Sequence, residues 1–257
     1  IYATLGFMNI PKHMSYSSLT TYLDCGWRYY LTKVEKRRER HSLWLTAGSA
    51  IHLALQNWDT RPGEVEDIWE ESWKEIYDDD VKNNGPEEGW DYKSREDKKW
   101  WLEEGLAMMD RWIEFRNRGW NVYKNYIEKE FEVEVGNSTV KMAVDRVMVD
   151  PEGKIVLLDI KTGASSQKHP LQLAVYAWAL KKVDGLNVDK AGFWDARTGV
   201  LSLWDLDYLH SENVEDVFSM FDIARSSGVF IPNFNSCGRC GVVRYCKWIN
   251  GKDADNG

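Results

Sequence analysis

The feature of this sequence that most constrains its fold is a change in hydrophobic period near residue 125. Before that point the apolar residues recur at helical intervals, whereas after it they alternate or run together with β-branched residues, as in strands. The segments with this strand pattern are 126–135, 139–150 and 154–161, and they are separated by Gly136-Asn137 and Pro151-Glu152-Gly153. Short turn-forming stretches between such segments predict a three-stranded antiparallel meander.

Helical patterns flank this meander on both sides. Before it, we expect helices over 15–33 and 46–58, and a strongly charged helical region over 64–121 with a turn near 83–86. After it, we expect a helix over 170–182, strands over 190–196 and 200–205, and a last helix over 214–226. The order helices, three strands, helix, two strands, helix indicates an α/β (α+β) fold with a mixed sheet.

The length of 257 residues suffices for one sizeable core. We expect a single domain over 15–249, with 1–14 as an N-terminal extension or tag and 250–257 as a tail. Within the domain, residues 60–124 are expected to form a helical insertion and residues 125–210 the core. An apolar stripe from Trp101 to Phe115 in the insertion is more often core than a surface on which bases stack.

The charge is unevenly distributed along the chain. The formal net charge of −8 argues by itself against a polyanionic partner, but segment 64–80 holds nine acids and one base and accounts for the whole sum. Segment 33–41 instead holds five bases and two acids. Such a basic run either faces a phosphate backbone or is a solvated helix end, and the sequence leaves both readings open.

No stretch reaches the run of about eighteen apolar residues that a membrane span needs, and the N-terminus lacks the pattern of a signal peptide. We therefore expect a soluble, cytoplasmic protein without a membrane partner. In that compartment the four cysteines are expected to be metal ligands or buried thiols, because cytosolic reductants keep thiols reduced.

The strongest candidate site combines Asp145 with the triplet Asp159-Ile160-Lys161. Residues two apart in a strand point to the same face, so Asp159 and Lys161 project together, and Asp145 on the preceding antiparallel strand can approach them. The triplet alone would also fit an ion pair on a solvent-exposed face. The apolar run 155–158 before it indicates a buried strand that ends in charge, which favours a functional site.

Two carboxylates at one point bind a hard divalent cation such as Mg²⁺ or Mn²⁺. The cation would polarise a phosphoryl oxygen and lower the pKa of a bound water, while Lys161 would orient that water or stabilise developing charge. His52, in a mostly apolar helix, is either a core residue or a further ligand that would favour Mn²⁺. Gln172 and Tyr176 lie four apart on a helix, either as a polar pair that closes the site or contacts DNA, or as a surface glutamine and a core tyrosine.

These residues occur in motifs whose order and context resemble those of a known family. The motifs are GSAIHLAL with His52, AVDRV with Asp145, LLDIKTG with Asp159 to Lys161, and LQLAVYAWAL with Gln172 and Tyr176. They resemble the successive motifs of RecB-like PD-(D/E)XK nucleases, which implies a restriction-endonuclease-like core.

The resemblance also implies roles for individual residues. It implies metal binding by His52, Asp145, Asp159 and the carbonyl group of Ile160, and catalysis by Asp145, Asp159 and Lys161. Glu130, in the segment KEFEVEV, is a candidate auxiliary acid.

The cysteines form a C-terminal cluster, Cys237-x2-Cys240-x5-Cys246, and one distant residue, Cys25, in the middle of the helix expected over 15–33. Four thiolates suit either a structural Zn²⁺ or a [4Fe-4S] cluster. The spacing resembles the iron-sulphur staple of AddB-type nucleases and of CRISPR-associated RecB-like exonucleases, which favours the cluster. The resemblance spans Ser15 to Trp248 and implies that the cluster holds the N-terminal helix against the C-terminal loop.

Two functions fit these motifs. The first is a stand-alone exonuclease on single-stranded DNA or DNA ends, acting with partner proteins in recombination, end processing or CRISPR-type spacer acquisition. The second is a DNA-end binding adaptor whose nuclease site is vestigial or licensed by a partner. The intact set of Asp145, Asp159 and Lys161 favours the exonuclease.

Overall fold

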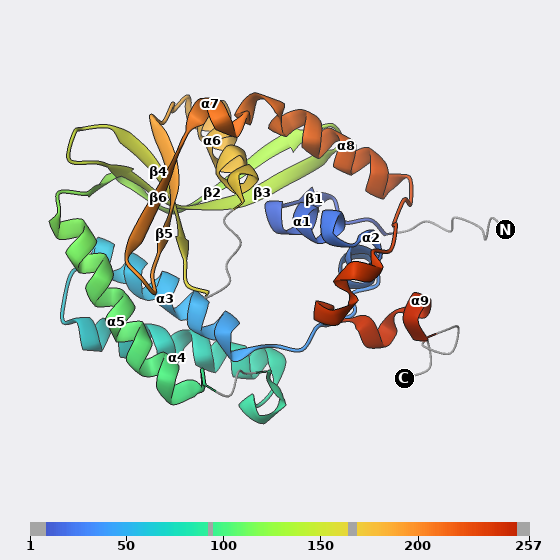
Figure 1. Ribbon diagram of the computed structural model, residues 1–257, viewed down its shortest axis with the longest axis horizontal. Helices are drawn as coiled ribbons and strands as arrows, with labels where there is room; N and C mark the ends of the chain where they lie inside the picture. Colours follow the sequence, from blue (N-terminus) through green and yellow to red (C-terminus); the bar gives the residue numbers. More distant parts are fainter. Residues whose placement is uncertain (1–8, 92–94, 164–168, 251–257) are drawn as a thin grey trace. The chain divides into compact units, whose positions relative to one another are not determined.

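The computed structural model describes residues 9–91, 95–163 and 169–250, and the chain divides into two compact units (Figure 1). The terminal unit comprises residues 1–39, 131–142 and 212–257, and the central unit comprises residues 40–130 and 143–211. Residues 1–8 of the expected extension and 251–257 of the expected tail lie outside the described residues. No helix in the described part of the chain is long and apolar enough to cross a membrane.

The central unit combines a layer of helices with strands of a mixed sheet. Its helices are α3 (Leu43–Thr60), α4 (Val65–Asn84), α5 (Lys98–Asn117), α6 (Pro170–Asp184), the short α7 (Leu206–Leu209) and a 3-10 turn (Glu87–Gly89). Its strands are β4 (Ile155–Lys161), β5 (Lys190–Asp195) and β6 (Val200–Asp205), together with parts of β2 (Asn121–Val135) and β3 (Ser138–Val149), which also run through the terminal unit.

The strand pairing in the central unit is both parallel and antiparallel. Strand β3 runs antiparallel to β4, β4 runs parallel to β5, and β5 runs antiparallel to β6. The parallel pair is joined by α6, as expected for a crossover connection between parallel strands. The predicted α/β fold with a mixed sheet is therefore confirmed.

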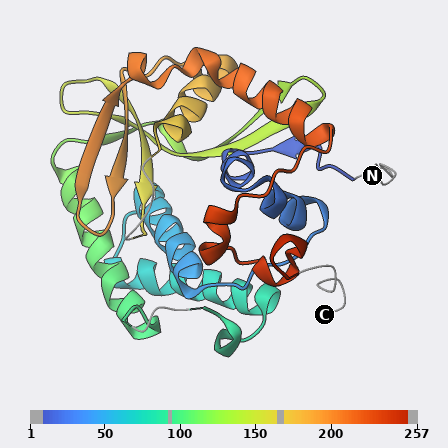
Figure 2. The ribbon, with the colours of Figure 1, turned by 45° about the vertical axis from the view of Figure 1, so that its right-hand side comes forward.

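Helices α3, α4 and α5 pack together on one side of strands β4 to β6, as Figures 1 and 2 show. Their core includes alternate residues of β4, namely Val156, Leu158 and Ile160. It also includes Trp101 and Phe115, so the prediction that the apolar stripe is core is confirmed. Helix α6 also contacts β4, and its residues from Leu173 to Leu180 are all buried.

The terminal unit consists of short elements around the chain ends. They are β1 (His13–Met14), α1 (Tyr16–Asp24), α2 (Gly26–Tyr29), a π-helical turn (Tyr30–Val34), α8 (Val214–Ser226), 3-10 turns at Phe234–Arg239 and Val243–Tyr245, and α9 (Lys247–Asn250). A further 3-10 turn, Ser211–Asn213, lies at the boundary of the units. Met14 is fully buried and pairs with Val140, so ordered structure begins before Ser15.

The prediction that Cys25 lies in the middle of a helix is wrong. Cys25 has an extended backbone, with φ −160° and ψ 109°, between α1 and α2. The neighbouring Gly26 packs against the backbone of Ile231, where an added Cβ would lie 2.7 Å from the nitrogen. This close approach breaks the helix, because the chain must turn at Cys25 to meet a segment about 200 residues away, and periodicity does not reveal such a contact.

The contact between α4 and α5 gives a test of the core of the central unit. A Cβ on Gly105 would lie 2.1 Å from the buried ring of Trp69, whose Nε1 donates to the Leu102 carbonyl at 2.9 Å. Gly105→Ala should therefore lower the free energy of unfolding by about 1–3 kcal/mol, despite the higher helix propensity of alanine. Gly89→Ala is the control, because nothing lies within 4 Å of its Cβ. Urea unfolding measures both variants, and a Gly105→Ala protein as stable as the control would contradict this packing.

Candidate active site

The register between β3 and β4 brings two buried aspartates together. Arg146 lies opposite Leu158, so Asp145 and Asp159 follow at the next position of the two strands. Asp145 is 7% exposed and Asp159 is 2% exposed. The backbone N–H of Ile160 donates to Asp145 Oδ2 at 2.7 Å, which fixes that carboxylate beside the triplet. The expectation that Asp145 approaches the end of β4 is thus met by the geometry.

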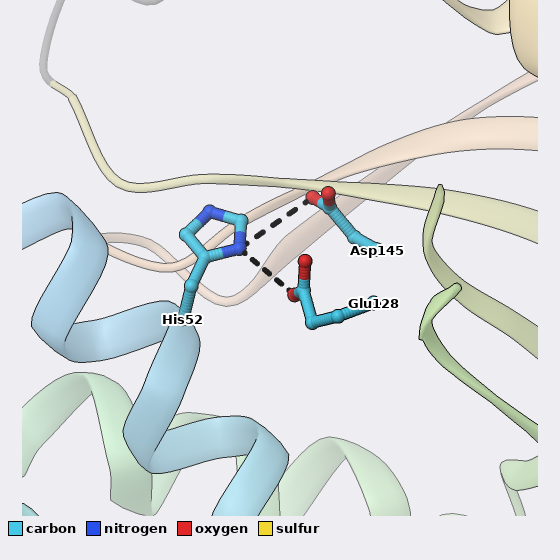
Figure 3. A group of neighbouring side chains, drawn as sticks. All are labelled: His52, Glu128 and Asp145. Carbon is cyan, nitrogen blue, oxygen red and sulfur yellow. Dashed lines mark hydrogen bonds and ion pairs between the residues drawn. The ribbon is translucent and has the colours of Figure 1, made fainter. Parts of the chain in front are cut away.

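Helix α3 brings His52 to these acids. His52 Nδ1 lies 3.2 Å from Glu128 Oε1 and 3.8 Å from Asp145 Oδ2 (Figure 3). One ligand atom from each of His52, Glu128 and Asp145 lies within 4.8 Å of the other two. An imidazole nitrogen and two carboxylate oxygens at such spacing form a donor set for a divalent cation.

Burial and mutual repulsion perturb the ionisation of this group. Burial and the neighbouring Asp159 raise the pKa of Asp145 to about 7, although His52 acts in the opposite direction. Burial also raises the pKa of Asp159, although Lys161 acts to lower it. Burial alone would lower the pKa of His52, but Asp145 and Glu128 raise it to about 9. Burial and the closeness of these carboxylates thus disfavour their ionised forms, and a divalent cation would offset that repulsion.

Lys161 lies at the start of a chain of polar contacts. Its Nζ is 2.8 Å from Asp159 Oδ2 and donates to Gln172 Oε1 at 2.7 Å. Gln172 Nε2 donates to Tyr176 Oη at 3.0 Å. The strand period therefore places Asp159 and Lys161 together, and the helical spacing places Gln172 and Tyr176 together, as the sequence predicts. These contacts hold the ammonium group of Lys161 beside the acids.

Sequence reasoning missed Glu128 and named Glu130 instead. Glu128 has φ +44°, in the left-handed region that residues other than glycine rarely adopt. Lys124 and Asn125 also have positive φ, so the first half of β2 does not alternate regularly. Regular alternation would give Glu128 and Glu130 the same direction, yet Glu128 contacts His52 and Glu130 is exposed. The Glu-x-Glu spacing was the available signal, but it could not select between the two acids.

His52 and Glu128 line a cleft of the central unit with a volume of about 810 Å³. Helix α3 contributes to the cleft wall one face whose residues recur with each turn, namely Trp44, Leu45, Gly48, Ser49, His52, Leu53 and Gln56. Glu128, Glu130, Thr162 and Arg197 also line it. A polymer lying in this cleft would pass His52 and Glu128.

The four cysteines line one cavity in the terminal unit, and none forms a disulfide. The backbone N–H of Asn233 donates to Cys25 Sγ at 3.3 Å. Burial raises the pKa of the Cys240 thiol, against the lowering effects of the Val242 N–H group and of Arg28. Over the described ranges, no three cysteine sulfurs lie within 4.8 Å of one another.

The fold and the site agree with a nuclease family. Residues 13–247 match the PD-(D/E)XK nuclease superfamily, and the chain belongs to it. Membership indicates metal-dependent nuclease activity and a DNA substrate. The chain is also similar to the Gene 69 protein of Mycobacterium phage L5, with 24% identity over 277 residues that cover 90% of this chain and 95% of that protein. A crystal structure of SSO0001 covers 90% of this chain and 94% of its own at 15% identity, with a TM-score of 0.38.

The two glutamates of β2 provide a matched test of the metal site. Glu128→Gln should weaken Mn²⁺ binding by about tenfold or more, because it removes a charged oxygen ligand beside His52. Glu130→Gln removes the same charge from an exposed position in the same cleft and should bind Mn²⁺ as the wild type does. Isothermal titration calorimetry on metal-free protein measures both affinities. Equal losses in the two variants would show that Glu128 acts only through the charge of the cleft.

Proposed function

We propose that this protein is a metal-dependent DNA exonuclease that hydrolyses phosphodiester bonds in single-stranded DNA or at DNA ends. One observation carries the proposal: Asp145, Asp159 and Lys161 meet behind His52, which lines an open cleft together with Glu128. A RecB-like relationship and a role in recombination, end processing or CRISPR-type spacer acquisition remain part of the proposal. The motif order supports the RecB-like assignment.

The residues fit a divalent cation. The proposed ligands are His52, Asp145, Asp159 and the carbonyl group of Ile160. Glu128 is added because one of its carboxylate oxygens lies within 4.8 Å of ligand atoms of His52 and Asp145. Asp159 Oδ2 is buried, and its contact with Lys161 is an ion pair without hydrogen-bond geometry. The Asp159 carboxylate can share its oxygens between the Lys161 ammonium group and a divalent cation. When bound, Mg²⁺ or Mn²⁺ would polarise the phosphoryl oxygen and supply hydroxide from a bound water near neutral pH.

The chain's own residues would orient the reaction. Lys161, held between Asp159 and Gln172, would donate to the attacking water or to the charge that develops on the phosphate. Tyr176 keeps Gln172 in place, so the ammonium group does not need to reorganise during the reaction. Gln172 and Tyr176 are therefore proposed as supporting residues.

Removal of the Lys161 ammonium group tests this mechanism. Lys161→Ala should lower the rate of cleavage of end-labelled DNA with Mn²⁺ or Mg²⁺ by about 100-fold or more, because it removes a preorganised donor. Lys154→Ala is the control, since Lys154 directly precedes the same strand and its side chain is 45% exposed. Gel electrophoresis of the products measures the rates. A Lys161→Ala protein as active as the control would remove the assigned mechanism.

The choice of substrate tests the exonuclease against its alternatives. An exonuclease should degrade linear single-stranded DNA and leave covalently closed circular DNA intact, whereas cleavage of circles would indicate an endonuclease. DNA-end binding without cleavage under any divalent cation would instead support the adaptor function.

We also propose that Cys25, Cys237, Cys240 and Cys246 hold a [4Fe-4S] cluster as a structural staple. The cysteines line one cavity, and a backbone N–H group already contacts the sulfur of Cys25. In a tetrahedral zinc site the sulfurs would lie only about 3.8 Å apart, from a Zn–S distance of about 2.3 Å. Within the described residues no three cysteine sulfurs lie within 4.8 Å of one another, and the preference for the cluster rests on the spacing of the cysteines in the sequence.

The colour of the protein tests the cofactor. Protein purified anaerobically should be brown, with broad visible absorption and about four iron atoms per chain. Cys246→Ser should lose this absorption, whereas EDTA should remove the divalent cation and leave the absorption unchanged. A colourless protein that contains one zinc would show a zinc staple, without affecting the nuclease proposal.

A further inference from the structure

A second charged cluster lies behind the acids of the site, inside the core of the central unit. The side chain of Arg146 is fully buried, and its Nε donates to Asp59 Oδ2 at 2.8 Å. Asp59 Oδ1 accepts a hydrogen bond from Trp112 Nε1 at 3.2 Å and pairs with Arg116. The Asp59 carboxylate is thus held by two guanidinium groups and an indole, which leaves Arg146 little freedom to move.

The guanidinium group of Arg146 also reaches the candidate metal site. Its Nη1 donates to Glu128 Oε1 at 3.1 Å and to the backbone carbonyl of Asp145 at 2.6 Å. His52 Nδ1 contacts the same Oε1 atom of Glu128. Within the described ranges, no hydrogen bond or ion pair involves Glu128 Oε2, so this oxygen is available to a cation. Figure 3 shows the Glu128 carboxylate beside both His52 and Asp145.

Stability alone is a poor explanation for this cluster. Taking ionised groups out of water costs free energy that their attraction only partly returns, and apolar residues of similar volume often pack as stably. The neighbours of Arg146 on β3, Val144, Val147 and Met148, are all fully buried apolar residues. An arginine at this position is better explained by the carboxylate that it holds. That carboxylate needs a tether, because the strained backbone of Glu128 does not fix its direction by regular alternation.

We propose that Arg146, itself fixed by Asp59, is a positioning residue for Glu128 and turns the Oε2 atom of that carboxylate to the divalent cation. The inference rests on the proposed function, since it takes Glu128 to be a ligand of the cation that the nuclease uses. The proposal adds Arg146, which lies inside the core, to the residues on which metal binding depends. Partners of metal ligands typically change metal affinity by about 10- to 100-fold when they are replaced.

The test measures Mn²⁺ binding to the purified full chain without DNA, beside its thermal unfolding. Arg146→Lys keeps the charge but cannot contact Asp59, Glu128 and the Asp145 carbonyl together, so Mn²⁺ affinity should fall by about 10- to 100-fold. Its cleavage rate should recover toward the wild-type rate at saturating Mn²⁺. Arg111→Lys is the control, because Arg111 lies on α5 and pairs with Glu104 at 2.7 Å, outside the cluster. The control should bind Mn²⁺ as the wild type does.

A double-variant cycle separates positioning from a general loss of structure. In a Glu128→Gln background, Arg146→Lys should change the remaining Mn²⁺ affinity by roughly twofold or less, since the oriented ligand is already lost. Equal losses of Mn²⁺ affinity in both backgrounds would overturn the positioning role of Arg146. The proposals that Glu128 is a ligand and that the protein is a nuclease would still stand. A wild-type protein that binds no Mn²⁺ and cleaves no DNA would overturn the proposed function, and this inference with it.

A second variant keeps the test decisive if Arg146→Lys does not fold. Asp59→Asn preserves the shape of the side chain but weakens the anchor of Arg146, so it should lower Mn²⁺ affinity in the same direction. Folded Asp59→Asn protein with wild-type Mn²⁺ affinity would contradict the proposal.

Discussion

The pairing of β3 with β4 is the constraint on which the central unit depends. Because side chains alternate along a strand, Asp145 and Arg146 leave the sheet on opposite faces. Arg146 enters the core beside Asp59 and Trp112, whereas Asp145 joins Asp159 at the candidate site. A shift of the register by one residue would exchange these faces, burying the acids among apolar side chains and leaving the arginine without its partner. The core and the site are therefore fixed by one register.

The two charged clusters of the central unit are balanced differently. In the core, Asp59 lies between two arginines, and the remaining charge of Arg146 is met by Glu128. Burial and repulsion instead disfavour the ionised forms of Asp145 and Asp159 at the site. A core requires its own residues to neutralise each ion, whereas a metal site leaves negative charge for a cation. Glu128 contacts both clusters, through Arg146 in the core and through His52 at the site. The two clusters can lie side by side because only the one at the site would bind a cation.

Much of the fold and part of the site could be predicted, because they depend on regular periods. The strand period places Asp159 beside Lys161, and the helical period places Gln172 beside Tyr176. The failures occur where the backbone leaves those periods. Glu128 itself has a positive φ, and Cys25 lies between two helices because a distant segment packs against its neighbour Gly26. Such irregular backbone is imposed by tertiary contacts, which local patterns do not contain.

Gly48 shows how a small local choice brings distant elements to one point. It lies four residues before His52 on α3, and an added Cβ would come within 3.0 Å of the hydroxyl of Thr162, which directly follows Lys161. Glycine at this position therefore allows the helix to approach the end of β4 closely. Because a helix is rigid over one turn, the same approach carries His52 to Asp145 and Glu128. The imidazole reaches the acids because Gly48, in the same sequence motif, is small, but the motif does not indicate that Gly48 meets Thr162.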